Sequence, residues 1–507
     1  MTDIATIPAA FRRAARPLGL VVPVAALLVT LLHLMLPPGP DVAWLTTVSE
    51  RMLAGQQLYA DILESNPPLA ALFYMLPVLL GRLIGVAPEP LIVLQTVGFA
   101  LFGTWFAARL VRRHTLLGTP ELFAPLAFLF VGAGWGMDFA QREHYALIAL
   151  LPVAVAIGVR LKGGRLSLGE VLLLAVLGGL CAATKPHFVV ALVVPALYSA
   201  LRRRSLWPLL APELLLAAAL FLAYWSWIAL SFPAYFGEVL PGLAAAYIPD
   251  RRPLVWLFLN LPAVGFVAFA LAAVTLFRRD ILARPLLGAL AMAGLGFFVA
   301  YMLQAKGYYY QSMPAFALMA LAVLFAFAER NGGLANPVDR MLPIGLAALF
   351  AFLPMPLEVR VFIERGALVD AVAPYGESLA IANLTSDLGA TNPLVRMVDG
   401  TFINSMPALL TTLSAWRITH KPGVDPALAA GAEAATAAER VRLRQDFLRQ
   451  PPDIVVTSKD GFDWPAWAAE DAAFATILAG YDEIGPVLFG DYDLLLLKRR
   501  GLEVVAN

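Results

Sequence analysis

Long stretches of this sequence carry almost no charge, and this feature restricts the chain to folds that span a membrane. Residues 18–36, 209–230 and 286–303 are almost entirely apolar, and about 18 such residues suffice for a helix to cross roughly 30 Å of hydrocarbon. Of the 507 residues, 60% are hydrophobic and 14% are charged, whereas about 25% are charged in a typical soluble domain. A soluble fold could not bury so much apolar surface, so we expect a polytopic α-helical membrane protein.

The positions of the basic residues predict how the helices cross the membrane. Arg12, Arg13 and Arg16 precede the first apolar run, and the N-terminus is expected in the cytoplasm because cytoplasmic segments are rich in arginine and lysine. Residues 68–84 are also apolar, but the later basic clusters fall on the cytoplasmic side only if this segment lies along the outer interface. About eleven spans then remain, at residues 18–36, 91–111, 119–136, 145–160, 168–184, 187–201, 207–231, 253–277, 285–304, 312–328 and 340–357.

The composition changes near residue 359, where the long apolar runs end and charged residues become frequent. We therefore expect a transmembrane domain over 1–358, with 38–90 as a first outer loop containing interfacial helices. Residues 359–507 are expected to form a C-terminal soluble α/β domain outside the cytoplasm, because an odd number of spans precedes it. Strand-like and helical pieces alternate there, the strands at 378–384, 453–457 and 493–498 and a helix at 426–449.

Several classes of function lack support in the sequence. The net charge of +1 hides a segregation of the charges by position, so the whole-chain value says nothing about nucleic-acid or acidic partners. We expect no nucleic-acid partner. Cys181 is the single cysteine, which excludes an intrachain disulfide and any site with several cysteine ligands. No Walker A sequence, dinucleotide-binding glycine loop or His-Glu-x-x-His motif occurs in a fitting context.

Polar residues gather first in the loop that follows the first span. Asp41 is the first carboxylate beyond the membrane, and Tyr59, Glu64 and Asn66 follow in the same loop. A partly desolvated carboxylate at such a position can act as a general base on a hydroxyl. The alternative is an ordinary solvated loop.

A second cluster lies between two apolar spans, where five polar groups are costly unless they pair or face a cavity. It comprises Asp138, Gln141, Arg142, Glu143 and His144. Arg142 could pair with Glu143 or Asp138 for purely structural reasons. Alternatively, the cluster binds a ligand, and Glu143 with His144 could contribute to a divalent-cation site although a third ligand is missing.

Two short connections carry the remaining candidates. Lys185 and His187 separate two spans by barely a turn, and Lys306 is followed by three tyrosines, of which Tyr310 is the last, and by Gln311. A lysine at the membrane surface can bind a lipid phosphate, and clustered tyrosines can stack on a sugar. An interfacial aromatic belt and lysine side chains that reach towards water explain the same residues without a ligand.

With these residues placed, the chain resembles the GT-C superfamily of integral membrane glycosyltransferases, the group of protein O-mannosyltransferases and bacterial lipid A aminoarabinose transferases. Asp41 directly after the first span, the Gly55-Gln56-Gln57-Leu58-Tyr59 turn and Asn66-Pro67-Pro68-Leu69 carry the resemblance. The later clusters around Glu143, Lys185 and Lys306 are similar to outer-face motifs of bacterial members. The order of elements matches over nearly the whole chain.

The resemblance implies an inverting glycosyltransferase of the bacterial inner membrane, with a polyprenyl-phosphate sugar donor and a glycan, lipid or protein acceptor outside the cytoplasm. Asp41 would be the general base, and Lys185, Lys306 or Arg142 would stabilise the departing lipid phosphate. No cofactor is certain, and a divalent cation stays open. Contacts to substrate are expected from Tyr59, Glu64, Asn66, Glu143, His144, His187, Tyr310 and Gln311.

A polytopic transporter or a lipid-linked sugar flippase is the main alternative, since either would also have many spans. Transporters usually place their charged residues near the middle of the membrane and often contain internal repeats. In this chain the polar clusters fall at one predicted face, and no repeat is evident. The sequence therefore favours the enzyme.

The predicted topology can be tested with reporter fusions. A reporter fused after Asn507 should be active outside the cytoplasm, and one inserted in 202–205 should be active inside, because an odd number of spans separates the N-terminus from the C-terminal domain. Activity of both reporters on the same side would contradict the eleven-span topology.

Overall fold

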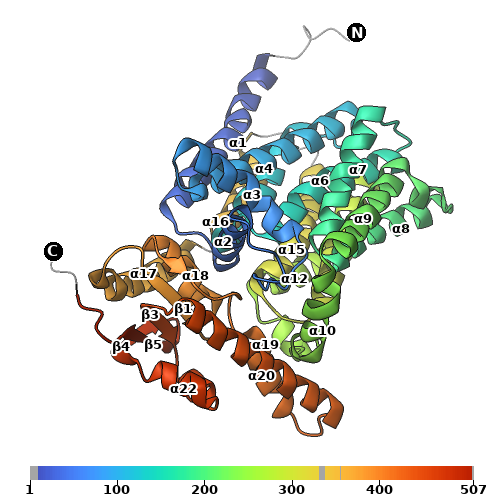
Figure 1. Ribbon diagram of the computed structural model, residues 1–507. Coiled ribbons are helices and arrows are strands. Elements are labelled where there is room, and N and C mark those ends of the chain that lie inside the picture. Colours follow the sequence, from blue (N-terminus) through green and yellow to red (C-terminus); the bar gives the residue numbers. More distant parts are fainter. Residues whose placement is uncertain (1–8, 331–336, 354, 505–507) are drawn as a thin grey trace. The chain divides into compact units, whose positions relative to one another are not determined.

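The structure is a computed structural model that describes residues 9–330, 337–353 and 355–504. The chain forms two compact units, each assembled from three separate stretches of sequence (Figure 1). Unit 1 comprises Met1–Met35, Pro90–Ser226 and Arg252–Met355. Unit 2 comprises Leu36–Glu89, Trp227–Arg251 and Pro356–Asn507. Each unit is described by itself.

Unit 1 is built from helices, and those long enough to cross a membrane lie where the apolar runs predict them. Six helices of the described residues have the required length and composition: the apolar part, Leu18–Met35, of α1 (Ala9–Met35), α4 (Pro88–Arg113), α6 (Arg142–Leu161), α9 (Pro212–Ser231), α14 (Pro285–Gln304) and α15 (Tyr309–Arg330). The other helices are shorter, namely α5 (Phe123–Phe128), α7 (Leu168–Thr184), α8 (Val189–Arg203), α11 (Leu254–Leu257), α12 (Leu261–Thr275), α13 (Arg278–Ala283) and α16 (Pro337–Phe352).

Each of the eleven predicted spans therefore contains a helix, and the expected polytopic helical fold is confirmed. The interfacial segment proposed at 68–84 is helix α3 (Leu69–Ile84), which belongs to unit 2. Pro77 lies inside this helix without ending it. The left-handed conformation of Gly85 ends α3, as is common at helix C-termini.

Small residues allow the helices of unit 1 to pack closely around α14. A Cβ added to Gly294 would lie 3.0 Å from the carbonyl oxygen of Ala315 in α15. A Cβ on Gly296 would lie 2.6 Å from the Cα of Ala191 in α8. Glycine at these two positions lets the three backbones approach one another, which is how helices commonly associate in membranes.

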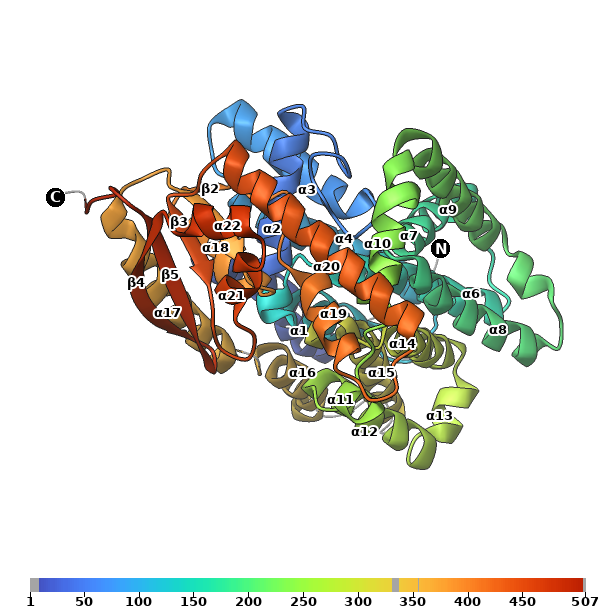
Figure 2. The same cartoon turned by 60° about the horizontal axis from the view of Figure 1, so that its bottom comes forward.

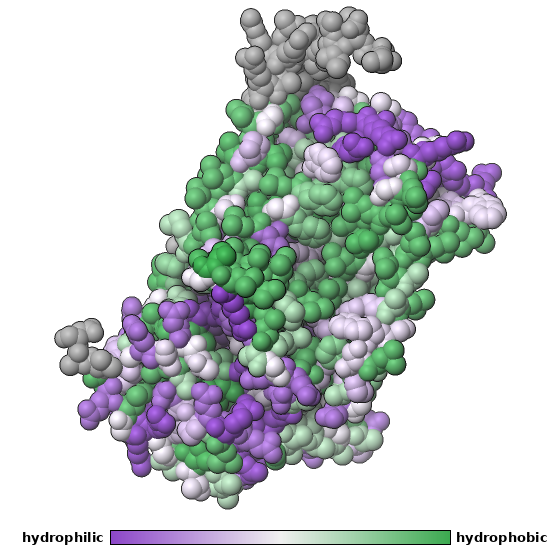
Figure 3. Space-filling view, turned by 45° about the horizontal axis from the view of Figure 1, so that its top comes forward, coloured by the Kyte–Doolittle hydropathy of each residue, from purple (hydrophilic) through white to green (hydrophobic). Residues whose placement is uncertain are grey.

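Apolar side chains on the outside of the helices give the surface its membrane-facing character. Figure 3 shows hydrophobic residues covering much of the helical surface. Leu83, Leu201, Leu222 and Leu230 are each more than 60% exposed. Such a surface is unfavourable in water and suits contact with lipid.

Ion pairs join helix ends of unit 1 where the sequence places cytoplasmic basic clusters. Arg113 Nη1 lies 2.6 Å from Glu170 Oε1, and Glu170 also forms a capping box with Ser167 at the start of α7. Arg160 binds Glu213 through two hydrogen bonds, of 3.0 and 2.9 Å. These pairs connect α4 with α7 and α6 with α9.

Unit 2 combines a mixed sheet with helices, of which α18, α21 and α22 lie next to the strands (Figures 1 and 2). Its sheet has the strand order β2-β1-β3-β5-β4. The strands are β1 (Ala380–Leu384), β2 (Thr401–Phe402), β3 (Ile454–Thr457), β4 (Tyr481–Phe489) and β5 (Tyr492–Arg499). The helices are α2 (Pro40–Leu53), α3, α10 (Leu240–Gly242), α17 (Met355–Val372), α18 (Leu388–Met397), α19 (Leu410–Thr419), α20 (Pro426–Arg449), α21 (Trp464–Ala469) and α22 (Ala472–Leu478).

The sheet confirms the α/β character expected for the C-terminal region. β1 and β3 are parallel and buried along their whole length, as expected for parallel strands covered on both faces. β4 and β5 form an antiparallel hairpin whose two-residue turn contains Gly490 at φ 66°. The helix predicted at 426–449 is α20, which runs beside α19 (Figure 2).

Two arginines fasten helix α2 to the sheet region of unit 2. Arg51 of α2 donates to the carbonyl oxygens of Asn404, at 2.7 Å, and of Phe402. Arg396 of α18 binds both carboxylate oxygens of Glu50 at 2.9 Å and also pairs with Glu89. Burial lowers the pKa of Arg51 to about 10. Burial also lowers the pKa of Arg396, but the opposite effect of Glu50 and Glu89 is larger and raises that pKa above its ordinary value.

We predict that Arg396→Ala destabilises unit 2 by about 2–4 kcal/mol, because it leaves two partly buried carboxylates without their cation. Arg360→Ala is the matched control, since Arg360 also has two acidic partners, Glu364 and Asp491, but is exposed. Thermal unfolding of the purified variants in detergent measures the difference. Equal unfolding midpoints for the two variants would show that the Arg396 pairs contribute no more than surface ion pairs.

Candidate functional site

The predicted site residues divide between the two units. Asp41, Tyr59, Glu64 and Asn66 lie in unit 2. Unit 1 holds the remaining eight, namely Arg142, Glu143, His144, Lys185, His187, Lys306, Tyr310 and Gln311. Within each unit the structure brings some of these side chains into direct contact.

Asp41 occupies the first turn of α2. Gly39 and Pro40 begin this helix, and proline is favoured at the first helical position because its ring fixes φ and no backbone donor is lost there. The Asp41 side chain is partly exposed, whereas Trp44, Leu45 and Val48 on the same helix are buried. A carboxylate at this end of a helix also interacts favourably with the helix dipole. The fold thus holds an accessible acid on a well-packed helix.

Glu64 is the centre of a buried hydrogen-bond network. Its carboxylate accepts from the indole nitrogen of Trp44 at 2.5 Å and from the backbone and side-chain nitrogens of Asn66 at 2.8 and 2.5 Å. The hydroxyl of Tyr59 donates to the carbonyl oxygen of Asn66 at 2.6 Å. Glu64 is 2% exposed and Tyr59 is fully buried. The three residues predicted to contact substrate therefore bind one another and fix the loop against α2.

The ring of Tyr59 also packs on the 227–251 stretch of unit 2. Tyr59 has a positive φ of 71°, a conformation that few non-glycine residues adopt. Its ring centroid lies 4.9 Å from that of Tyr235 and 5.7 Å from that of Phe232. Burial, helped by the charge of Glu64, raises the pKa of Tyr235 to about 12. The Tyr235 hydroxyl is therefore a hydrogen-bond donor rather than a base at neutral pH.

In unit 1, Lys185 forms an ion pair with Glu143 and lies near the ring of Tyr310. Lys185 Nζ lies 2.5 Å from Glu143 Oε1, and both side chains are nearly inaccessible. The same ammonium lies 5.7 Å from the ring centroid of Tyr310, within the range of a cation–π interaction. Tyr310 in turn stacks on the more exposed ring of Tyr308. The start of α6, the α7–α8 connection and the start of α15 meet at this pair.

The two histidines of the predicted site have close partners within the protein. His144 Nε2 lies 2.7 Å from the carbonyl oxygen of Val131, and His144 Nδ1 accepts from the backbone nitrogen of Ala140. The His144 ring also stacks on Trp135 at 4.5 Å. His187 contacts the side-chain amide of Gln304. Both ring nitrogens of His144 have partners within the protein, and the substrate contact expected of this ring stays a prediction.

The remaining predicted residues occupy different environments. Arg142 and Gln311 are buried. Lys306 is partly exposed in the short connection between α14 and α15, where Ala305 and Gly307 both have positive φ. Lys306 is thus the more accessible of the two predicted phosphate-binding lysines.

Glu143 and His144 are the two residues for which the sequence left a divalent cation open. In the parts of the chain that the structure describes, no three His, Cys, Asp or Glu side chains are grouped so as to hold a metal ion. Glu143 is bound by Lys185, and both nitrogens of His144 are engaged. A divalent-cation site at these two residues stays a prediction, and among the described residues no third donor of these types joins them.

Sequence reasoning missed residues that hold the candidate site together. Trp44, which donates to Glu64, and Arg396, which pairs with Glu50 and Glu89, are not among the residues that the sequence patterns single out. Arg51 lies in the same polar loop as Asp41 but was not assigned a contact. Local sequence could not reveal these contacts, because Arg51 and Glu50 have their partners, Asn404 and Arg396, more than 300 positions away.

We predict that Lys185→Met lowers the free energy of unfolding by about 3–5 kcal/mol, because it leaves the buried Glu143 carboxylate without its cation. Adding Glu143→Gln to the same chain should recover most of this loss, since the remaining amide is neutral. Thermal unfolding of the single and double variants in detergent provides the measurement. A double variant as unstable as the single one would show that the charge pair is not the cause.

No protein-family model and no curated protein matches the chain. Among solved structures it is similar to the crystal structure of ArnT from Cupriavidus metallidurans bound to undecaprenyl phosphate. The TM-score is 0.56 at 13% sequence identity, over 96% of this chain and 99% of the other. The likeness thus covers both the helical region and the C-terminal region. The chain therefore has the same polytopic helical fold, with a C-terminal domain, as that structure.

Proposed function

We propose that this protein is a membrane glycosyltransferase that moves a sugar from a polyprenyl-phosphate donor to an acceptor hydroxyl outside the cytoplasm. The full-length likeness to ArnT carries the proposal, because that structure contains undecaprenyl phosphate, the lipid product expected from such a donor. Asp41 on its well-packed helix adds chemical support.

The proposed reaction exchanges one bond at the anomeric carbon for another. The acceptor oxygen attacks the anomeric carbon as the bond to the phosphate oxygen breaks, so the configuration at that carbon inverts. Asp41 takes the proton of the attacking hydroxyl, and polyprenyl phosphate leaves with the bonding electron pair. The protein must therefore supply a base for the hydroxyl and positive charge for the phosphate.

The contacts in unit 1 rank the candidates for phosphate binding. Glu143 already neutralises Lys185, so the main role of Lys185 is structural. Lys306 is partly exposed beside Tyr308 and the start of α15. We therefore assign the phosphate contact to Lys306 first, with Arg142 as a buried second cation.

Asp41→Asn should lower the rate of sugar transfer by a factor of about 10²–10⁴, the usual contribution of a general base. The amide keeps the size of the side chain but cannot accept the proton. Purified protein in liposomes without any ion gradient is supplied with radiolabelled undecaprenyl-phosphate sugars, and label on the acceptor is counted. Transfer by the wild type under these conditions also distinguishes an enzyme from a gradient-driven transporter.

Asp61→Asn is the matched control, because Asp61 is an exposed acid of the same loop whose visible role is to accept from the backbone nitrogen of Gln57. It should keep most of the activity. Glu50 is unsuitable as a control because its loss breaks the pair with Arg396. Near wild-type transfer by correctly folded Asp41→Asn would remove Asp41 as the base, and loss in Glu143→Gln alone would move that role to α6.

A further inference from the structure

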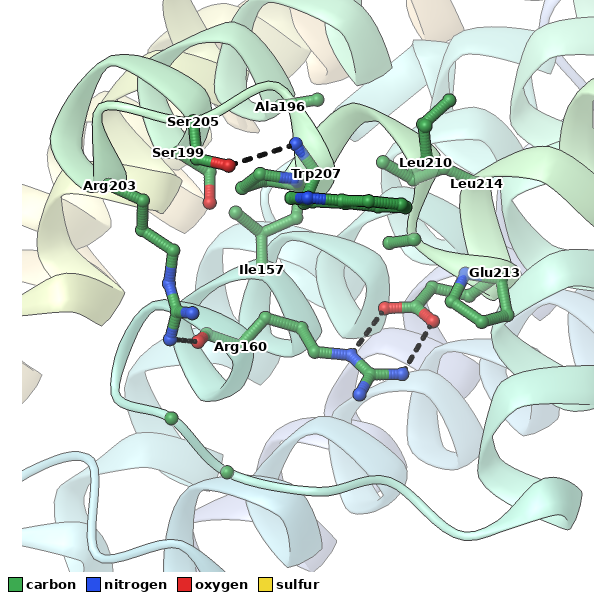
Figure 4. A pocket seen from close by; sticks show the side chains of 15 residues that line it. Ile157, Arg160, Ala196, Ser199, Arg203, Ser205, Trp207, Leu210, Glu213 and Leu214 are labelled. Atoms are coloured by element: carbon green, nitrogen blue, oxygen red, sulfur yellow. Dashed lines mark hydrogen bonds and ion pairs between the residues drawn. The ribbon is translucent and has the colours of Figure 1, made fainter.

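A cavity of about 540 Å³ lies within unit 1 and contains none of the candidate site residues (Figure 4). The end of α6, the second half of α8 and the start of α9 enclose it. Lys185 precedes α8, whereas Arg203 is the last residue of that helix. The cavity therefore lies at the end of α8 opposite to the Lys185–Glu143 pair.

The cavity contains one arginine that is neutralised and one that is not. Arg160 and Glu213 form a two-point ion pair, which leaves no net charge (Figure 4). Arg203 donates to the carbonyl oxygen of Arg160 at 2.5 Å, and no carboxylate of the described residues forms an ion pair with it. Ser199 and Ser205 also line the cavity and add hydroxyl groups. This side of the cavity suits an anion with several oxygen acceptors.

Beside the charged groups, the cavity has an apolar rim that faces outward. Trp207 and Leu210 line it and are 77% and 50% exposed. Exposed tryptophan is typical of the membrane–water interface. A ligand that fits both parts must join an anionic group to hydrocarbon.

We propose that this pocket binds the headgroup of an anionic phospholipid. The phosphodiester contacts Arg203 and the serine hydroxyls, and the acyl chains lie along Trp207 and Leu210. The volume falls within the usual range for ligand sites, about 300–1,000 Å³. Basic pockets between membrane helices are known to recognise such headgroups. Under the predicted topology this is the cytoplasmic leaflet, which is rich in anionic lipid.

Quenching of tryptophan fluorescence tests the proposal on the full-length protein in detergent micelles. The probes are phosphatidylglycerol and phosphatidylcholine with dibrominated acyl chains, which quench nearby indoles. Phosphatidylglycerol should quench more strongly at equal concentration, and Trp207→Phe should lose this difference. Quenching of other tryptophans is expected to be the same for both lipids.

Arg203→Gln should raise the phosphatidylglycerol concentration for half-maximal quenching about fivefold, the effect of one arginine near an anionic lipid. Glutamine can still donate to the carbonyl of Arg160, so folding should survive. Arg165→Gln is the matched control, because Arg165 is an exposed arginine in the loop after α6 and does not line the cavity. It should leave the titration nearly unchanged.

Two outcomes would overturn the proposal. Equal shifts in Arg203→Gln and Arg165→Gln would mean that general surface charge attracts the lipid. If excess inorganic phosphate abolished the difference in quenching between phosphatidylglycerol and phosphatidylcholine, the pocket would be assigned to a soluble anion. Persistence of the difference in phosphate, together with its loss in Arg203→Gln, is the result expected for a lipid site. None of these outcomes depends on the proposed sugar transfer.

Discussion

Burying a charged side chain inside the helical unit of this protein is costly, and at two places where helices meet an opposite charge offsets that cost. Glu143 neutralises Lys185, and Glu213 neutralises Arg160. Because removing an ion from water costs several kcal/mol, each pair fixes which helices lie side by side. The same constraint decides which charged side chains can still bind a ligand. A lysine already bound by a carboxylate contributes little net charge to a ligand.

Much of the fold could be predicted because lipid imposes rules that act over short stretches of sequence. Every predicted span contains a helix, and the α20 prediction at 426–449 matches its observed bounds, Pro426–Arg449. The limits of the three predicted strands were also nearly correct. Strand β4 was missed because its burial does not alternate regularly and because Gly485 and Pro486 interrupt it. Period-two alternation is the signal on which strand prediction depends.

The candidate site was harder to predict, because the same polar side chains serve binding sites and structural networks. Tyr59, Glu64 and Asn66 hold one loop against α2, while the substrate contact expected of them stays a prediction. Glu143 and Lys185 were chosen for separate roles and turn out to be partners. Local sequence identifies chemically capable residues. It does not tell whether their partner is a ligand or another side chain 42 positions away.

The division of unit 2 into three stretches has a consequence for the order of events on the ribosome. Glu50 and Arg396 are 346 positions apart, so at about 5–20 residues per second their synthesis is separated by roughly 20 to 70 seconds. During that interval the first loop is already made, while the strands and the arginine that complete its packing do not yet exist. Helix α2 thus reaches its final environment only after nearly all membrane helices have been translated. The C-terminal region, which is synthesised last, therefore completes the packing of the first loop, which is synthesised early.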